Sequence, residues 1–117
     1  MDDDFDAHTL RVLEFAAITE MLAERTACAL GAERARELLP SPVAAFVRDR
    51  QQETAEARLL TAQHGPLPLG GIHDIRPALV RAEVAQSLTP HELLDVASTL
   101  ISASRLKGFL LRQAEKK

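Results

Sequence analysis

The segment TPHELLDVASTLISASRLKGFLLRQ, residues 89–113, decides the fold class of this chain. It opens with Thr89, a proline in the next position and Glu92 three residues later, which is the capping-box pattern of a helix start. Apolar and small side chains then recur every three or four residues: Leu93, Val96, Ala97, Leu100, Ala103 and Ser104. Side chains at this spacing share one face of a helix, so the segment predicts one long helix. Gly108 weakens that helix by about 1 kcal/mol relative to alanine but does not end it.

Shorter helical patterns precede this segment. Apolar residues recur at helical spacing from about Thr9, and the pattern fades near Cys28. Gly31 is expected to break it, and residues 32–39 then form a short helix that stops before a proline. Ser41 and Pro42 have the residue types of an N-cap and a first helical position, so the next helix is expected to start there and to run to about residue 63.

A connector rich in proline and glycine, PLPLGGIHDIRPAL over residues 66–79, follows that helix. Gly65 can take the left-handed conformation that ends a helix, and the prolines cannot continue one. Gly70 and Gly71 are expected to supply unusual backbone dihedral angles for a tight turn. Asp74 or Arg76 is expected to anchor the connector by capping a helix or by pairing with another layer. The following residues, 75–87, predict a short helix with proline in its first turn.

These elements predict an all-α fold, an irregular multi-helix domain with two longer helices, several short ones and an ordered connector near residues 65–76. Residues 1–8 are expected to be an acidic, frayed N-terminus. Residues 9–117 are expected to form a single helical domain. The chain ends in RQAEKK without a helix stop signal, and we expect it to be the N-terminal fragment of a longer chain.

Composition bounds the function classes. The 117 residues are 46% hydrophobic but only 3% aromatic, so the core must be built mainly from aliphatic side chains. The net charge of -3 gives no general reason to expect a nucleic-acid binder. Residues 59–117, however, hold seven basic and five acidic residues. One cysteine, no apolar run that spans a bilayer and no secretory signal are typical of a cytoplasmic protein, so no membrane partner is expected.

The residues show no catalytic, cofactor-binding or metal-binding constellation. None of His8, His64, His73 and His91 pairs with a second ligand at helical spacing, although two of them flank the connector. Cys28 is interpreted as a small packed residue, with a nucleophilic thiol as the alternative. PLGGIHD lacks the patterns of phosphate-binding loops.

A basic stripe is the one candidate for nucleic-acid contact. Arg105, Arg112 and Lys116 are seven and four residues apart and therefore share one helix face. They can contact phosphate, or they can complement the negative end of the helix dipole and stay solvated. The helix over residues 48–58 is polar on all sides, which is typical of a bridging, exposed or partner-docked helix.

Several stretches of the chain resemble a known family when they are taken together, in their order and spacing. They are residues 9–41, QQETAEARLL over residues 51–60, and PLGGIHDIRPALVRAEVAQSLTPHELLDVASTLISASRLKGFL over residues 68–110. The resemblance is to the bacterial MutS-type family, in the branch called MutS two, and it covers almost the whole chain. The chain departs from the family after Ala85, where QSL lacks the expected glycine, so the turn before Thr89 is expected to differ.

The resemblance implies a non-catalytic core and lever region of a longer, ATP-hydrolysing endonuclease. ATP, magnesium, the Walker motif and the nuclease residues belong to other domains of such a protein, so no cofactor is expected in this one. The family resembles proteins that bind branched or mismatched DNA, suppress homologous recombination and split collided ribosomes. The implied partners are nucleic acid, the other domains of the same chain and a second copy in a homodimer.

Two other hypotheses remain open from the sequence. The first is a free-standing helical module for protein–protein interaction, which a reading frame ending near Lys117 would favour. The second is a small enzyme that uses the thiol of Cys28, which alkylation no faster than that of a free peptide thiol would eliminate.

Overall fold

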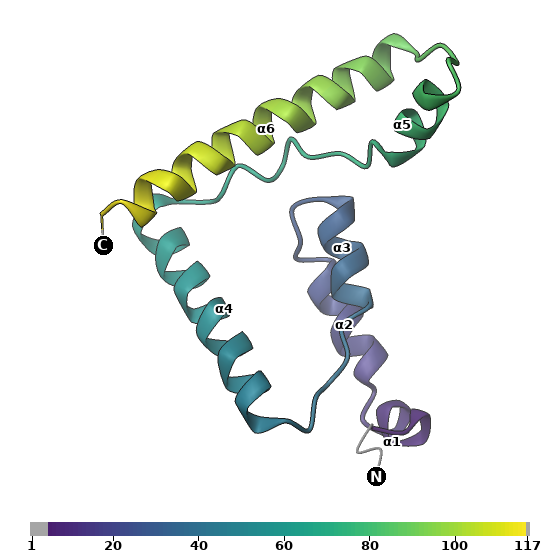
Figure 1. Ribbon diagram of the computed structural model, residues 1–117. Helices are drawn as coiled ribbons and strands as arrows, with labels where there is room; N and C mark the ends of the chain where they lie inside the picture. The colour runs from purple at the N-terminus through teal and green to yellow at the C-terminus, as the bar shows by residue number, and fades with distance from the viewer. Residues whose placement is uncertain (1–4, 117) are drawn as a thin grey trace. The chain divides into compact units, whose positions relative to one another are not determined.

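The fold is all-α, as the sequence predicts. The computed structural model describes residues 5–116, and within that range it contains helices and no strand. The helices are α1 (Ala7–Val12), α2 (Phe15–Ala23), α3 (Ala29–Arg36), α4 (Ala44–His64), α5 (Arg76–Glu83) and α6 (Pro90–Ala114), drawn in Figure 1. Two of them are long, with 21 residues in α4 and 25 in α6. No helix in residues 5–116 combines the length and hydropathy that a membrane crossing requires.

The chain divides into two compact units. One comprises residues 1–25 and 33–67, and the other comprises residues 26–32 and 68–117. The expectation of a single domain over residues 9–117 stays a prediction. Buried apolar residues in the described part of the chain are small ones, namely Ala23, Ala35 and Ala78.

The first helix begins earlier than its predicted start at Thr9. Asp6 is the N-cap of α1, and its Oδ1 accepts a hydrogen bond from the Thr9 N–H at 2.6 Å. That bond stabilises the ionised carboxylate and lowers the pKa of Asp6. The acidic start predicted for residues 1–8 therefore includes the first residues of a helix, and residues 1–4 lie outside the described range.

The continuous helix predicted from Thr9 to near Cys28 is wrong, because the chain breaks at Glu14. This residue has a left-handed φ of 53° and is the N-cap of α2. Its N–H donates to the Arg11 carbonyl, and its own carbonyl accepts from Ala17 and Ile18. One residue thus closes α1 and opens α2. Apolar spacing continues across it, which is why the sequence pattern did not reveal the break.

The second break was predicted at Gly31, but this residue lies inside α3. The chain leaves helical conformation earlier, after Ala23, and re-enters it at Ala29. A Cβ on Gly31 would lie 3.3 Å from the Thr26 Cβ. Its role is therefore to allow close packing of the preceding loop.

Helix α4 starts two residues after the predicted position. Ser41 does not cap it. Its Oγ instead accepts a hydrogen bond from the Val43 N–H at 3.2 Å, a local turn that competes with helix formation. Val43 is the N-cap, without a side-chain hydrogen bond. At the other end Gly65 has a φ of 81°, and its N–H donates to the Thr61 carbonyl.

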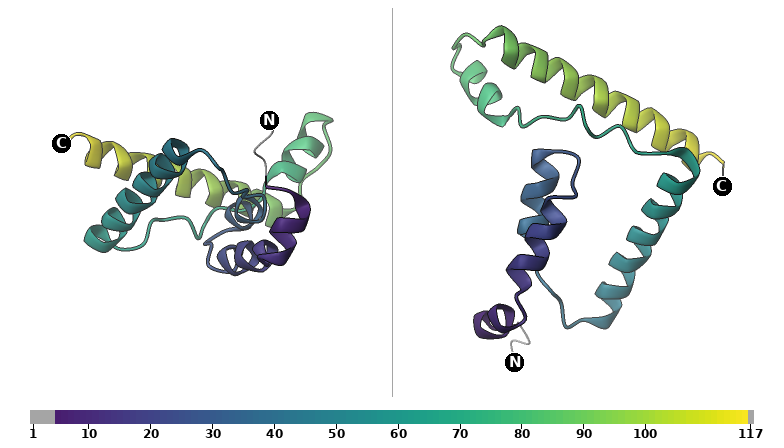
Figure 2. Two further views of the ribbon diagram at one scale, coloured as in Figure 1. Left: turned by 90° about the horizontal axis from the view of Figure 1, so that it is seen from below. Right: turned by 180° about the vertical axis from the view of Figure 1, so that it is seen from behind.

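In the second unit the connector runs alongside α6, and α5 lies near the start of that helix (Figures 1 and 2). Helix α5 ends in a Schellman motif: the Gln86 N–H donates to the Arg81 carbonyl, and the Ala85 N–H donates to the Ala82 carbonyl. Glycine is the usual residue at the left-handed position of this motif. Here it is Ala85, with a φ of 57°. The turn is therefore formed without the expected glycine.

Candidate functional site: the connector and helix α6

Hydrogen bonds dock the connector on α6. The Ser98 Oγ donates to the Gly71 carbonyl at 2.8 Å, and the His73 N–H donates to the Thr99 Oγ1 at 3.0 Å. The Thr99 hydroxyl donates in turn to the Asp95 carbonyl of its own helix. Connector backbone groups that cannot join a helix thus find partners on α6.

Gly71 approaches α6 so closely that a side chain has no room. A Cβ there would lie 2.2 Å from the Ser102 Oγ and 3.1 Å from the Ser98 Oγ. Gly70, in contrast, has nothing within 4 Å of its Cβ position. Neither glycine has a left-handed φ, so the unusual dihedral angles predicted for both are not present. Glycine is required at Gly71 because a side chain there has no room beside α6. Gly70 has no such requirement.

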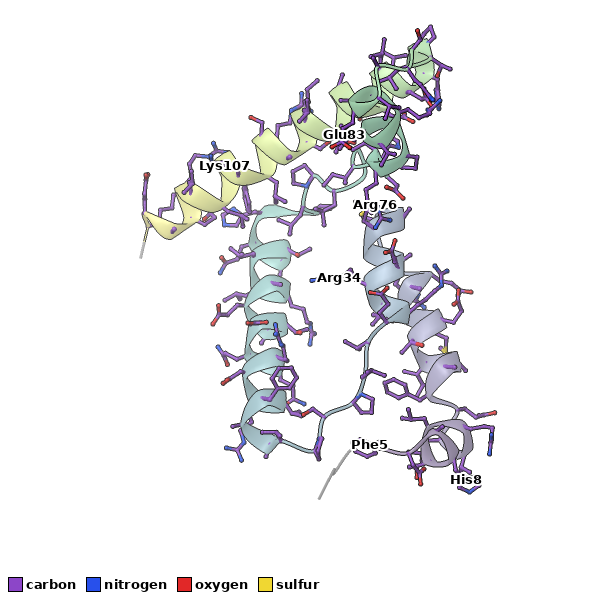
Figure 3. The ribbon with its side chains drawn as sticks, turned by 45° about the vertical axis from the view of Figure 1, so that its right-hand side comes forward. Phe5, His8, Arg34, Arg76, Glu83 and Lys107 are labelled. Carbon is purple, nitrogen blue, oxygen red and sulfur yellow. The ribbon has the colours of Figure 1, made fainter. Side chains whose placement is uncertain are left out.

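Asp74 and Arg76 form the anchor at the start of α5. The Asp74 Oδ1 accepts from the Arg76 N–H at 3.1 Å and from its Nε at 2.8 Å, and Oδ2 accepts from Nη2 at 2.9 Å. The Arg76 side chain therefore lowers the pKa of Asp74. Ile75 is the N-cap of α5 and makes no side-chain hydrogen bond, and Asp74 just before it accepts from the N–H of the first helical residue, Arg76. Figure 3 shows Arg76 at this helix start.

Thr89 and Glu92 form the capping box of α6. The Thr89 Oγ1 accepts from the Glu92 N–H at 3.2 Å, and the Glu92 Oε2 accepts from the Thr89 N–H at 2.8 Å. The other carboxylate oxygen of Glu92 pairs with Arg81 of α5. One carboxylate thus caps α6 and holds α5 against its start.

His73 of the connector and His91 of α6 flank the carboxylate of Asp95 on α6. Nε2 of His73 lies 3.9 Å from one oxygen of Asp95, and Nε2 of His91 lies 3.5 Å from the other. Within residues 5–116, no group of three or more histidine, cysteine or acidic side chains could hold a metal ion. His8 lies in the other unit, 3.1 Å from the Arg11 Nη2. Cys28 is half-buried, and its carbonyl accepts from Thr26.

The predicted basic stripe lies at the C-terminal end of α6. Arg105 and Arg112 are exposed on the helix, and Lys116 is exposed in the turn that follows. The Arg112 Nη1 lies 3.3 Å from the Cβ position of Gly108, so its guanidinium folds back over that glycine. Lys107 also projects from this half of α6, as Figure 3 shows. Lys107 was not among the predicted nucleic-acid contacts, because it does not share the helical spacing of Arg105, Arg112 and Lys116.

The face of α6 with Leu93, Leu100 and Leu111 is apolar and uncovered in this structure. These side chains are 55%, 62% and 55% exposed. They are seven and eleven residues apart, so they lie on one side of the helix. Such a broad apolar face is typical of a surface that packs against another element.

The unit formed by residues 1–25 and 33–67 has its own ion pair and hollow. Arg36 of α3 donates two hydrogen bonds of 2.8 Å to the Glu20 carboxylate of α2, which lowers the pKa of Glu20. An open hollow of about 430 Å³ lies beside this pair. Its lining comprises Ala7, Leu10, Arg11, Glu14, Phe15, Ala16, Thr19, Arg36, Leu38 and Leu39. This mostly apolar lining offers packing surface.

The sequence of the chain is similar to part of a family of larger proteins. No family model and no solved structure matches the chain. Endonuclease MutS2 of Symbiobacterium thermophilum is 51% identical over 108 residues, which make up 92% of this chain. The chain is homologous to a region of Endonuclease MutS2. MutS2 proteins of a Geobacillus strain and of Bacillus cytotoxicus match at 44% over 108 residues and 42% over 102 residues.

The chain spans only part of these MutS2 relatives. The matched region is 14% of the first two proteins and 13% of the third. It covers 92% of this chain in the first two comparisons and 87% in the third. The resemblance read from the sequence and the MutS2 relatives therefore agree on the family, and they relate the chain to one part of a larger protein.

Proposed function

We propose that this chain is a non-catalytic scaffold, the N-terminal part of the core and lever region of a MutS2-type protein. The observation that carries the proposal is the 51% identity over 92% of the chain with a protein named Endonuclease MutS2. In this proposal the ATP and magnesium site and the nuclease centre lie in other domains of the whole protein. The chain supplies rigid helices that transmit movement to the parts that hold nucleic acid.

The geometry of α6 supports a transmitting role. A helix of 25 residues extends about 37 Å, enough to cross a small domain. The connector is fixed to it by two side chain–backbone hydrogen bonds, and α5 is held to its start by an ion pair. These contacts favour movement of the connector, α5 and α6 as one body. The uncovered apolar face with Leu93, Leu100 and Leu111 offers a packing surface for other domains of the same chain.

The finer assignments follow the family resemblance. We propose that the whole protein is cytoplasmic, forms a homodimer, binds branched or mismatched DNA and suppresses homologous recombination. The second candidate activity is the splitting of collided ribosomes, with contact to ribosomal RNA. The same resemblance favours it.

A chimera tests the scaffold proposal. The matched region of the Geobacillus MutS2 protein is replaced by this chain, and ATP hydrolysis is measured with and without branched DNA. We expect the chimera to hydrolyse ATP and to respond to DNA as its parent does. The control is a chimera with Leu100→Glu, which places a charge on the apolar face and should lower the thermal midpoint. A soluble chimera whose stability ignores that change would contradict the packing role.

The isolated chain gives a second test. We expect no ATP turnover and no nucleic-acid cleavage above a mock purification, because residues 1–117 contain no phosphate-binding loop pattern. Turnover that rises in proportion to the purified chain would overturn the non-catalytic assignment.

A further inference from the structure

The C-terminal half of α6 concentrates positive charge. No aspartate or glutamate occurs between Asp95 and Glu115. Four exposed basic side chains occur over the same stretch and in the turn after it: Arg105, Lys107, Arg112 and Lys116. Among the described residues none of these four pairs with a carboxylate, whereas both basic residues of α5 do. These charges are therefore available to an external anion.

Helix geometry divides the four residues into a stripe and an outlier. At about 100° per residue, Arg105 and Arg112 lie within about 20° of each other and about 10 Å apart along the axis. Lys116 follows one turn further on. Lys107 is two residues from Arg105 and therefore projects about 200° away, on the other side of the helix. Arg105 and Arg112 thus share one face of α6, Lys116 follows them in the turn after the helix, and Lys107 lies on the other side of the helix.

Gly108 shapes this stripe. The Arg112 Nη1 lies 3.3 Å from the place where a Cβ of Gly108 would be, so the guanidinium occupies the space that the missing side chain leaves. Helical side chains lean toward the N-terminus, and here Arg112 reaches back one turn toward the level of Arg105. A glycine in the middle of a long helix is unfavourable by itself. At this position it leaves room for the Arg112 guanidinium to lie against the helix.

We propose that Arg105, Arg112 and Lys116 form a contact surface for the phosphate backbone of nucleic acid that does not depend on base sequence. Guanidinium groups match phosphate oxygens with paired donors, and contacts of this kind position a duplex without reading its bases. Phe109 is half-buried, so the stripe offers no exposed aromatic ring for base stacking. The choice of nucleic acid among polyanions rests on the proposed function.

The stripe predicts weak, salt-dependent binding by the isolated chain. Three phosphate contacts give a slope of about -3 in a plot of log affinity against log salt, or about 100-fold between 20 and 100 mM salt. The net charge of -3 opposes binding at longer range. Binding is therefore expected at low salt and is expected to be lost near physiological salt.

Fluorescence anisotropy of the purified chain with labelled linear and branched duplexes of unrelated sequences tests this surface. Arg105→Gln should weaken binding several-fold at low salt and reduce the slope by about one, and the Arg105→Gln/Arg112→Gln pair should reduce it by about two. Lys107→Gln removes the same charge from the same helix and should leave the slope unchanged. Circular dichroism confirms that each variant is folded.

The outcomes separate cleanly. An equal loss for Lys107→Gln and Arg105→Gln would show that net charge alone matters, and it would overturn the stripe. Absence of binding at the lower salt, or binding unaffected by the double change, would overturn it as well. Preference for anionic phospholipid vesicles over duplex would overturn the nucleic-acid assignment. None of these results bears on the ATP hydrolysis of the chimera without DNA or on its thermal midpoint, so failure of the stripe and failure of the scaffold role are distinguishable.

Discussion

At the scale of single residues, Gly71 is the glycine of the described chain that leaves least room for a side chain. A methyl group there would overlap the Ser102 Oγ at 2.2 Å, and Ser102 is only 8% exposed. We expect Gly71→Ala to lower the free energy of unfolding by about 1–2 kcal/mol, the usual cost of overpacking. The measurement is chemical denaturation followed by circular dichroism.

Two companion variants sharpen this prediction. Gly70→Ala is the matched control, because nothing lies within 4 Å of its Cβ position, and it should cost little. Ser102→Ala in the Gly71→Ala background removes the clashing oxygen and should recover most of the loss. If Gly70→Ala is as destabilising as Gly71→Ala, loop entropy and not the close approach explains the effect.

Ala85 offers the opposite change. It holds a left-handed φ of 57°, which costs an L-residue about 1 kcal/mol or more. Glycine takes this conformation freely but loses more entropy on folding, so Ala85→Gly should stabilise the chain by about 0.5 kcal/mol. Ala82→Gly, inside α5, is the control and should destabilise. A lower thermal midpoint for Ala85→Gly would contradict the Schellman geometry.

At the scale of secondary structure, the capping box of α6 is the most testable feature. Thr89→Ala removes the acceptor of the Glu92 N–H and should cost about 1 kcal/mol of stability. Thr89→Ser keeps the hydroxyl and should be close to neutral. An unchanged thermal midpoint for Thr89→Ala would mean that another residue starts the helix.

Sequence patterns predicted the elements with local signals and missed those set by geometry. Helix α6 and its cap, helix α5 with Pro77 near its start, and the end of α4 at Gly65 all follow from residue types at fixed offsets. The break at Glu14 carries no such signal, because a glutamate rarely adopts a left-handed φ.

The candidate site shows the same division. The proline and glycine composition predicted an ordered connector, but it assigned the same role to Gly70 and Gly71. Which glycine is indispensable depends on its distance to α6, and that distance joins residues 31 positions apart in the chain. The sequence therefore did not predict that the connector packs against Ser98 and Ser102 of α6.

At the scale of the whole molecule, three carboxylates make stability depend on pH. Asp6, Glu20 and Asp74 have pKa values lowered by their hydrogen-bond partners. A lowered folded-state pKa contributes stability above the unfolded value, and that stability is lost as the pH falls through the folded value. We expect a nearly constant thermal midpoint from about pH 7 to pH 5 and a decline below about pH 4.

The variant Glu20→Gln measures how much the ion pair between Glu20 and Arg36 contributes to the decline of the thermal midpoint in acid. The variant keeps a hydrogen-bonding group near Arg36 but does not titrate, so its midpoint should fall less steeply in acid. A decline identical to that of the unchanged chain would place the effect on the other carboxylates.

Helix α4 has a consequence for how the sequence can vary. None of its 21 residues is buried, and several of its polar contacts run along the helix itself, such as Arg50 to Glu53 and Gln52 to Glu56. Substitutions at its exposed positions act mainly through helix propensity and neighbouring charges. An exposed side chain of α4 is therefore a suitable place to attach a fluorophore.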